Sequence, residues 1–232
     1  MVGIEDPTKA ITPAIENYLK AIYTLQQEHG EATTTALGEQ LDGIKPGSVT
    51  GMLKRLAELK LVTYTPYQGV VLSLAGERIA LEVVRHHRLL ELYLVEMLGY
   101  SWDEVHEEAE QLEHYISEKL EARIAAQLGY PQFDPHGDPI PTLEGTLPQP
   151  AGQRLSDLPV GTCGEVIRVV DQHPERLRYL SSLGLVPGEQ VTVTATAPFQ
   201  GPLSVQVRNT VQPIDYRLAR MIFVTVTNES VG

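Results

Sequence analysis

Histidines and carboxylates gather between residues 86 and 114, where four of the seven histidines of the chain lie. His87 and Glu91 are four residues apart, so on a helix they share one face. A second stripe follows on the next predicted helix at the spacing i, i+4, i+7 and i+8, and it consists of His106, Glu110, Glu113 and His114. A face that only packed against a neighbouring helix would be apolar, whereas imidazoles and carboxylates together suit first-row divalent ions. The spacing therefore predicts metal binding.

An enzymatic use of these residues is the main alternative. Glu113 and His114, with His106, could hold a hydrolytic metal ion, but no separate nucleophile or general base stands out. The sequence has no Gly-x-Ser-x-Gly elbow, no phosphate-binding glycine loop and no His-Glu-x-x-His pair. His86, next to the first predicted ligand, is expected at the surface. A non-catalytic metal site is therefore favoured, and a metal-dependent hydrolase stays open as the alternative.

Composition and charge narrow the class of protein. The chain has 232 residues, 42% of them hydrophobic, and a net charge of −12, which is typical of a globular protein with one or two domains. No apolar run approaches ~18 residues, the N-terminus lacks a signal pattern, and the single cysteine, Cys163, excludes an internal disulfide, so we expect a cytoplasmic protein. Half of the 30 acidic residues lie in 77–145. The negative net charge of the whole chain is therefore no argument against DNA binding by residues 1–76, which lie before this acidic segment.

The first part of the chain has the pattern of a winged helix-turn-helix. Helices are expected from Pro13 to Gly30, over residues 34–41 and from Pro46 onwards, since capping hydroxyls or prolines precede apolar residues at helical spacing. Short β-type runs at 61–65 and 70–74 flank a hairpin loop over residues 66–69. The third helix has a polar face of short hydroxyls and long cations, which suits a helix that enters a DNA groove. The residues expected at DNA are Lys45, Gly47, Ser48, Thr50, Lys54 and Arg55.

The remainder predicts further helices, an extended segment and a small β-barrel. One helix is expected over residues 74–98 and another from about 101 to 128. The Pro- and Gly-rich stretch 131–152 is expected to be an extended linker anchored by Ile140 and Leu143. Beyond it, one short helix at 174–183 interrupts short strands, a pattern typical of a small barrel. These strands are expected at 164–170, 190–196, 203–208 and 222–227.

The sequence resembles the diphtheria-toxin-repressor family of metal-dependent transcriptional repressors over residues 11–227. Several motifs carry this resemblance together, and Leu183–Gly188 is similar to the SH3-like domain that such repressors share with ferrous-iron-transport accessory proteins. The motifs are Glu16-Asn17-Tyr18-Leu19-Lys20-Ala21-Ile22-Tyr23, Lys45-Pro46-Gly47-Ser48-Val49-Thr50, Tyr67-Gln68-Gly69-Val70-Val71-Leu72-Ser73, His87-Arg88-Leu89-Leu90-Glu91, Val105-His106-Glu107-Glu108-Ala109-Glu110, Glu113-His114 and Gly137-Asp138-Pro139-Ile140-Pro141.

The resemblance and the patterns together imply an α+β chain. Its parts are a winged helix-turn-helix DNA-binding domain (1–74), an all-α dimerisation and metal-binding domain (75–141), a linker (142–154) and a small SH3-like β-barrel (155–232). Within this organisation the resemblance implies two metal sites per subunit.

The first implied site uses Glu110, Glu113 and His114, with Asn17 from the first helix. The second uses His87, Glu91 and His106, completed by side chains of the SH3-like domain, where Asp171, His173 and Glu175 lie near the matching position. Two residues depart from the family pattern. Asn17 stands where relatives have Asp or Met, and Lys20 stands where some manganese-responsive relatives have Glu.

The predicted function is a metal-activated transcriptional repressor of metal-uptake and homeostasis genes. Mn²⁺ is the expected ion and Fe²⁺ the alternative. The resemblance implies a homodimer on a palindromic operator in double-stranded DNA, because two winged helices at helical-turn spacing double the contacts of one. A metal ion that favours one arrangement of the domains would shift the population towards it. A hydrolase and a metal-storage or interaction module are the alternatives from other classes.

Overall fold

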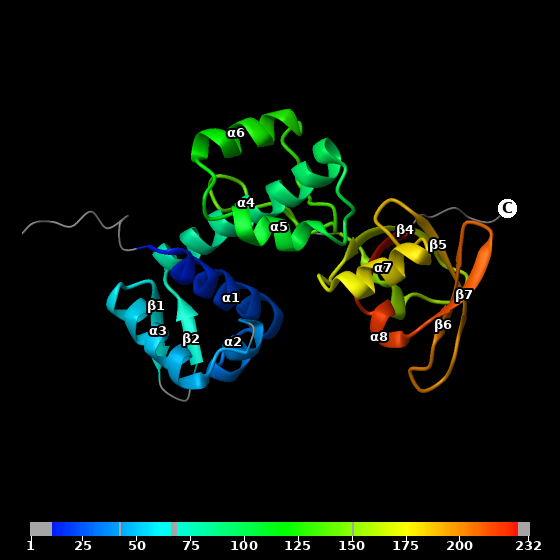
Figure 1. Cartoon of the computed structure of the whole chain (residues 1–232). Helices are drawn as coiled ribbons and strands as arrows, with labels where there is room; N and C mark the ends of the chain where they lie inside the picture. Colours follow the sequence, from blue (N-terminus) through cyan, green and yellow to red (C-terminus); the bar gives the residue numbers. More distant parts are fainter. Residues whose placement is uncertain (1–10, 42, 66–68, 150, 227–232) are drawn as a thin grey trace, which may run out of the picture. The chain divides into compact units, whose positions relative to one another are not determined.

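The computed structural model describes residues 11–41, 43–65, 69–149 and 151–226. The chain divides into two compact units, which alternate along the sequence. Figure 1 shows the helices and strands in sequence colours. The first unit comprises residues 1–86, 113–116 and 141–146, and the second comprises the remainder. Each unit is described by itself. No helix in the described ranges combines the length and the apolar character that crossing a membrane would require.

The first unit begins with the predicted winged helix-turn-helix. Its helices are α1 (Pro13–His29), α2 (Thr34–Gln40) and α3 (Pro46–Glu58), and strands β1 (Val62–Thr65) and β2 (Gly69–Leu72) pair antiparallel. Thr12 caps α1 by accepting from the Ile15 amide, and Gly30 ends that helix in a left-handed conformation. Of the predicted hairpin loop, residues 66–68 lie outside the described residues. The core holds the fully buried side chains of Ile15, Leu19, Ile22, Leu37, Leu53 and Leu56.

The helices that follow the wing are α4 (Leu74–Leu98), α5 (Val105–Leu112) and α6 (Glu118–Gln127). The long helix α4 has the predicted bounds. The prediction of one helix from 101 to 128 is wrong, since a turn separates α5 from α6. Ser117 starts α6 as its N-cap and accepts a hydrogen bond from the Leu120 amide. Glu113 and His114 therefore lie in this turn rather than on a continuing helical stripe.

Part of the Pro- and Gly-rich segment, residues 134–141, is packed rather than a free spacer. Asp134 and residues 136–141 are buried, because two arginines of α4 donate to carbonyls of the segment. Arg85 donates to the Pro141 carbonyl at 2.7 Å, and Arg88 donates to the Pro139 carbonyl. Ile140 is 2% exposed, as expected of an anchor, whereas Leu143 is 74% exposed. The prediction of a linker is therefore wrong for residues 134–141, and Leu143 is not an anchor.

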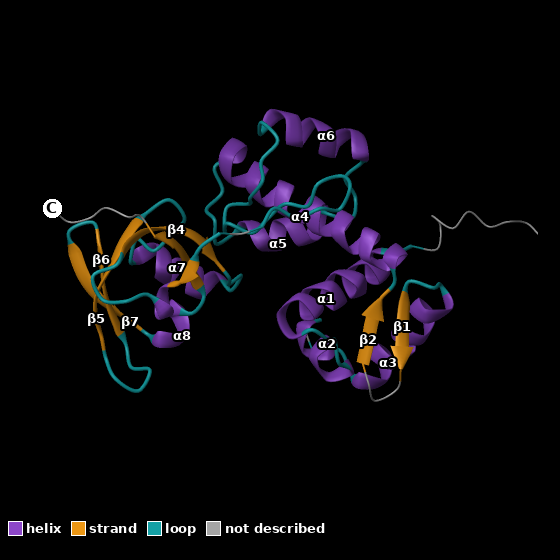
Figure 2. Cartoon of the chain, turned by 180° about the vertical axis from the view of Figure 1, so that it is seen from behind, coloured by secondary structure: helices purple, strands orange, loops and turns teal. Residues whose placement is uncertain are grey.

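The C-terminal part is an antiparallel sheet with short helices, as Figure 2 shows, and it has its own hydrophobic core. Its strand order is β3–β8–β4–β5–β6–β7. The strands are β3 (Gln153–Arg154), β4 (Cys163–Val169), β5 (Gln190–Thr196), β6 (Leu203–Val207), β7 (Thr210–Ile214) and β8 (Ile222–Val226). The helices are η2 (Leu155–Asp157), α7 (Pro174–Ser182) and α8 (Tyr216–Ala219). Irregularities in register on β4 and β5 bend the sheet around buried aliphatic side chains. The SH3-like prediction agrees with this sheet, although β3 and β7 were not predicted.

Candidate metal centre

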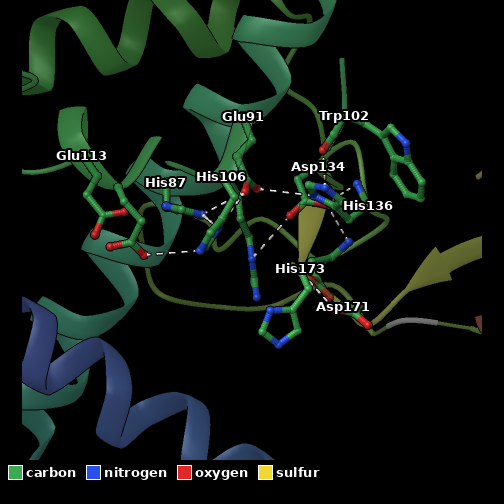
Figure 3. A network of polar contacts seen from close by, with 12 residues as sticks. His87, Glu91, Trp102, His106, Glu113, Asp134, His136, Asp171 and His173 are labelled. Carbon is green, nitrogen blue, oxygen red and sulfur yellow. Dashed lines mark hydrogen bonds and ion pairs between the residues drawn. The ribbon is translucent and has the colours of Figure 1, made fainter. Parts of the chain in front are cut away.

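Glu91 lies at the centre of a buried polar network in the second unit (Figure 3). Its Oε1 atom is 2.9 Å from Nε2 of His87 and 3.4 Å from Nδ1 of His106. Its Oε2 atom lies 3.7 Å from Nδ1 of His136. Glu91 is fully buried in this arrangement. One carboxylate thus joins a histidine pair on α4 and α5 to a histidine of the segment after α6.

Two groups of potential ligand atoms meet around this carboxylate. His87, His106 and Glu110 form one group, and Glu91, Asp134 and His136 form the other, with the atoms of each group within 4.8 Å of one another. The second group is entirely buried. Imidazole nitrogen and carboxylate oxygen are the ligands of Mn²⁺, Fe²⁺ and Zn²⁺ in proteins. Both groups therefore have the chemistry of a divalent metal site.

The second group is held in place by its own backbone. Oδ1 of Asp134 accepts hydrogen bonds from the amides of His136 and Asp138, at 2.8 and 2.9 Å. Nε2 of His136 lies 2.8 Å from the carbonyl oxygen of Trp102, so this nitrogen carries a proton and donates it. Nδ1 is then the ring atom that faces Glu91. A partner on the far nitrogen is how proteins usually orient a metal-binding histidine.

The charge of Glu91 is stabilised by its neighbours. Burial raises the pKa of the Glu91 carboxyl, but the charge of His87 and the contacts with two further histidines outweigh burial. Together they hold this pKa well below its usual value. Glu91 is therefore a carboxylate in the metal-free protein and ready to act as a ligand.

The pKa values of Asp134 and His136 are both raised. Burial and repulsion from the carboxylates of Asp138 and Glu91 raise the pKa of Asp134 to about 8, although His136 and Arg88 oppose this. Burial alone would lower the pKa of His136, but contact with the Glu91 carboxylate and its negative charge outweigh burial and raise this pKa to about 9. Both groups thus hold protons near neutral pH, and a metal ion would have to displace them.

Two buried polar atoms test whether an ion fits between these side chains. Within the described part of the chain, Oε2 of Glu91 and Nδ1 of His136 have no hydrogen-bond partner. Such orphaned buried atoms are costly unless something binds them. Their separation of 3.7 Å exceeds a hydrogen bond and is close to the spacing of about 3–3.6 Å between two ligands that share a metal ion at bond lengths of ~2.1 Å. The residues present therefore fit a divalent ion.

A separate polar group lies in the first unit, around the turn after α5. Nζ of Lys20 lies 3.0 and 2.8 Å from the two carboxylate oxygens of Glu113. Nδ1 of His114 lies 2.6 Å from Oε2 of Glu16. Oδ1 of Asn17 is buried and has no hydrogen-bond partner among the described residues. The structure thus brings the predicted ligands Glu113 and His114 into contact with side chains of α1. In the same unit, the buried Oδ1 atom of Asn17 is an acceptor without a donor among the described residues.

His86 supports this turn from α4. Its Nδ1 atom lies 3.1 Å from the backbone oxygen of Glu113, and the residue is 7% exposed. The prediction that His86 is a surface residue is wrong, because the turn after α5 covers it. The second histidine of the pair, His87, has its own contacts in the network of the second unit.

Three further predicted ligands, Glu110, Asp171 and His173, lie in a different ligand group from the predicted one or outside both ligand groups. Glu110 groups with His87 and His106, and its expected grouping with Glu113 stays a prediction. Asp171 accepts a hydrogen bond from the backbone amide of His173 at 2.9 Å (Figure 3). It also pairs with Arg176, at 2.9 Å. The His173 side chain is exposed at the start of α7. Asp171 and His173 are in neither ligand group found among the described residues, and their role as ligands also stays a prediction.

The predicted DNA-contacting residues share the solvent face of α3. Val49, Leu53 and Leu56 bury the opposite face. Lys45, Gly47, Ser48, Lys54 and Arg55 are exposed, while Thr50 is half-buried and its hydroxyl donates to the Pro46 carbonyl at 2.9 Å. The exposed face therefore presents cations and a hydroxyl, as a helix that meets phosphates and base edges requires.

Comparison with known proteins agrees with this arrangement. Three family models match in order: the iron dependent repressor N-terminal DNA binding domain at residues 10–70, the iron dependent repressor metal binding and dimerisation domain at 74–142, and the FeoA domain at 153–226. The iron-dependent repressor IdeR of Mycobacterium tuberculosis is 34% identical over 193 residues, which cover 78% of this chain and 84% of the relative. The chain belongs to the diphtheria-toxin-repressor family.

Other relatives of the repressor are named for manganese. A solved manganese-dependent transcriptional repressor in complex with manganese is 40% identical, with a TM-score of 0.83, and the match covers 92% of this chain and all of the other. The regulator MntR of Oceanobacillus iheyensis is 34% identical over 119 residues, covering 51% of this chain and 80% of the relative. The protein is a metal-dependent transcriptional repressor with a DNA-binding and a dimerisation domain. Members of the family are regulators rather than enzymes, so the hydrolase alternative does not apply.

Sequence reasoning missed part of the network around Glu91. Asp134 and His136 fall in the stretch that the sequence predicts to be a linker. In the first unit, Glu16 beside His114 is likewise not among the predicted ligands. A usable signal was present, because the run Asp134-Pro135-His136-Gly137-Asp138 places a histidine between two acids just after the helical domain. That run has no helical periodicity, so spacing rules did not connect it to Glu91. Only the burial of the segment shows the association.

Proposed function

We propose that Mn²⁺ activates this repressor and that the metal-loaded homodimer binds a palindromic operator near genes of metal uptake. The observation that supports the ion most directly is the ligand chemistry around Glu91. Asp134, His136 and Glu91 offer oxygen and imidazole nitrogen in a fully buried group. Mn²⁺ binds least tightly among the divalent series, so a site favours it through hard oxygen ligands and geometry.

The absence of sulfur from the candidate ligands supports the same choice. Neither ligand group among the described residues contains a cysteine, and the one cysteine of the chain, Cys163, lies on β4 beside Gln190. A thiolate would favour softer ions. Fe²⁺ is the second candidate, because the mycobacterial relative is named an iron-dependent repressor.

The dimer is proposed to form through the helical domain. A groove between α4 and α6 carries exposed apolar side chains, with Met97 at 42% and Leu120 at 47% exposure. Apolar side chains that gather in one groove with a polar rim suit an interface between protein chains. The groove is lined by Tyr93, Met97, Leu120, Arg123, Ile124 and Gln127. The matching family model is described as a dimerisation domain. Two copies of α3 would then read the two halves of a palindrome.

Metal binding is proposed to act on DNA binding by linkage. Glu113 and His114 contact Lys20 and Glu16 of α1, a helix of the DNA-binding domain. An ion at Glu113, His114 and Asn17 would alter these contacts. Any ion that binds one arrangement of the domains more tightly stabilises that arrangement.

The decisive experiment is operator binding by protein freed of metal with a chelator. Mn²⁺, Fe²⁺ (anaerobically), Co²⁺ and Zn²⁺ are added in turn at buffered free concentrations, and retardation of a palindromic promoter fragment is measured with a scrambled fragment as control. We expect no specific complex without metal and activation by Mn²⁺. A response to Fe²⁺ but not to Mn²⁺ would support the iron alternative. Equal binding with and without every ion would contradict metal activation.

A further inference from the structure

Lys20 occupies both carboxylate oxygens of a predicted metal ligand. Its Nζ atom lies 3.0 Å from Oε1 and 2.8 Å from Oε2 of Glu113. The Glu113 side chain is completely buried, and the Lys20 side chain is 16% exposed. This is a short, charge-assisted contact in a dry environment rather than a surface pair. Without a cation beside it, a buried carboxylate would be strongly destabilising.

The ammonium group and a metal ion require the same lone pairs. A carboxylate ligand binds its ion through one or both oxygens, and both oxygens of Glu113 lie within hydrogen-bond distance of Lys20. Two positive charges on one buried carboxylate repel each other at short range. Binding of a divalent ion through Glu113 therefore requires Lys20 to leave or to give up at least one oxygen.

The neighbouring predicted ligand, His114, is oriented so that a ring nitrogen stays available, whereas Glu113 is covered by Lys20. Nδ1 of His114 lies 2.6 Å from Oε2 of Glu16, and this carboxylate keeps the proton on Nδ1. Nε2 of His114, buried and 3.5 Å from Oε1 of Glu113, then carries the lone pair. Glu16 and Lys20 are four residues apart on α1. One helix thus orients His114 for an ion and at the same time covers Glu113.

We propose that Lys20 is a tethered competitor of the metal ion, which neutralises Glu113 in the metal-free repressor and is displaced by a divalent cation. The proposal rests on the proposed role of Glu113 as a ligand. Lys20 raises the free metal concentration needed to fill this site, because every binding event must first break the Lys20–Glu113 pair. Lys20 belongs to α1, so its release changes the contacts of the DNA-binding domain when the ion enters.

A structural ion pair and a competitor predict opposite results. In the full-length protein, Lys20→Gln removes the charge and leaves the buried carboxylate poorly compensated. Stripped of metal, this variant should melt ~5 °C below wild type, while it should bind Mn²⁺ at least about fivefold more tightly. A residue that served only the fold would lower thermal stability and metal affinity together.

The measurements are thermal unfolding by circular dichroism in chelator and calorimetric titration with Mn²⁺. Lys119→Gln is the matched control, because Lys119 is an exposed lysine of α6 and its loss changes the net charge equally. Lys20→Arg is the second variant. Its guanidinium fork should hold the carboxylate in two parallel hydrogen bonds and lower the Mn²⁺ affinity. Unchanged or weaker Mn²⁺ binding by Lys20→Gln, or unchanged binding by Lys20→Arg, overturns the proposal.

A third variant separates this proposal from the function on which it rests. Glu113→Gln should remove one Mn²⁺ binding event from the titration. If it removes none, Glu113 is not a ligand, and both the ligand assignment and the competitor role fail. If it removes one event while Lys20→Gln leaves the affinity of that event unchanged, the metal site stands and only the competitor role fails.

Discussion

Nδ1 of His136 lies 3.7 Å from Oε2 of Glu91, and within the described residues neither buried atom has a hydrogen-bond partner. The two residues come from α4 and from the segment after α6, which are 45 positions apart in sequence. Their charges are complementary in the metal-free chain, since the pKa of Glu91 is held low and that of His136 is raised to about 9. The pair therefore couples proton binding to folding, and the proposed metal site would couple both to metal binding.

The stability of the metal-free repressor should fall as the pH rises from 6.5 to 9. The folded protein raises the pKa of His136 from 6.5 to about 9, so the stabilisation is fully present below pH 6.5 and is lost as the pH passes 9. For His136 alone this amounts to about 3 kcal/mol at most. Asp134 acts in the same direction, because its pKa is raised to about 8 and its contribution is lost as the pH rises through that value.

Urea unfolding in chelator at several pH values measures this slope. The control is His136→Asn, which lacks the titrating ring and should lose most of the change in unfolding free energy between pH 6.5 and 9. If wild type and variant had the same pH dependence, the raised pKa of His136 would be wrong.

Trp102 should report metal binding at His136. It is the only tryptophan of the chain, and its ring stacks on His136 with centroids 5.5 Å apart and an interplanar angle of 29°. An ion at Nδ1 displaces the proton of the imidazolium and so changes the charge beside the indole. Saturating Mn²⁺ should therefore change the tryptophan emission of wild type and of Glu113→Gln, but not that of His136→Gln. A full response in His136→Gln would exclude His136 as a ligand.

DNA binding should depend on Arg55 through phosphate contact. Arg55 is exposed on the polar face of α3. Arg55→Ala should weaken binding to all DNA sequences and lower the slope of log affinity against log salt by about one. Arg217→Ala is a matched control, because Arg217 lies on α8 of the C-terminal domain and its side chain is 88% exposed. Metal-loaded protein is titrated with labelled operator at several salt concentrations. An unchanged affinity and slope would mean that this face of α3 does not contact DNA.

Local signals predicted the helices and strands well. Thr12, Pro13 and Gly30 mark the ends of α1, and the prediction for α4 has the observed bounds because the apolar residues of that helix recur until Gly99. The same reasoning overran the end of α5, because no glycine or proline stands between α5 and α6. That turn is stabilised by contacts across 93 and 98 residues, from Lys20 to Glu113 and from Glu16 to His114. Contacts of that range leave no periodic trace in a sequence.

The candidate site was only partly predicted, because local spacing groups residues of one helix and not residues that are distant in sequence. Helical spacing paired His87 with Glu91 on α4, the family resemblance added His106 of α5, and the structure brings these three side chains together. Asp134 and His136 lie outside any helix or strand, and they reach Glu91 only because the segment around them is buried. Their composition looked like that of a linker. Burial of an irregular segment depends on donors elsewhere, here the side chain of Arg88, and composition does not reveal it.

Gly137 should be indispensable for the geometry of the Asp134–His136 group. Its φ angle is +85°, and a Cβ atom there would lie 2.0 Å from the backbone oxygen of Ile167 on β4. Gly137→Ala should therefore cost about 2–4 kcal/mol of unfolding free energy and weaken the Mn²⁺-dependent change in Trp102 emission. Gly51→Ala is the control, because Gly51 lies on α3 with open space around it, and alanine there should stabilise the helix by up to about 1 kcal/mol. Equal stability of both variants would show that the close approach at Gly137 is not required.

Glu110 should decide which metal activates the repressor. Its carboxylate lies 3.9 Å from Nε2 of His106 and groups with His87 and His106, and its side chain is 38% exposed, so an ion can reach it. The carboxylate is a hard ligand suited to Mn²⁺, whereas a thiolate at the same position would favour softer or more tightly bound ions. Glu110→Cys should therefore keep the fold and shift activation of operator binding from Mn²⁺ towards Fe²⁺, Co²⁺ or Zn²⁺.

The matched control is Glu107→Cys, because Glu107 is an exposed carboxylate of the same helix outside both ligand groups. Operator binding is measured against each buffered free metal concentration, anaerobically, for wild type and both variants. The order of the metals should change in Glu110→Cys and stay the same in Glu107→Cys. The Irving–Williams order gives the later ions the higher intrinsic affinity at any site with mixed ligands. The informative result is therefore that Glu110→Cys loses the preference for activation by Mn²⁺. An unchanged order in Glu110→Cys would remove Glu110 from the metal site and leave the choice of ion to Glu91, Asp134 and His136.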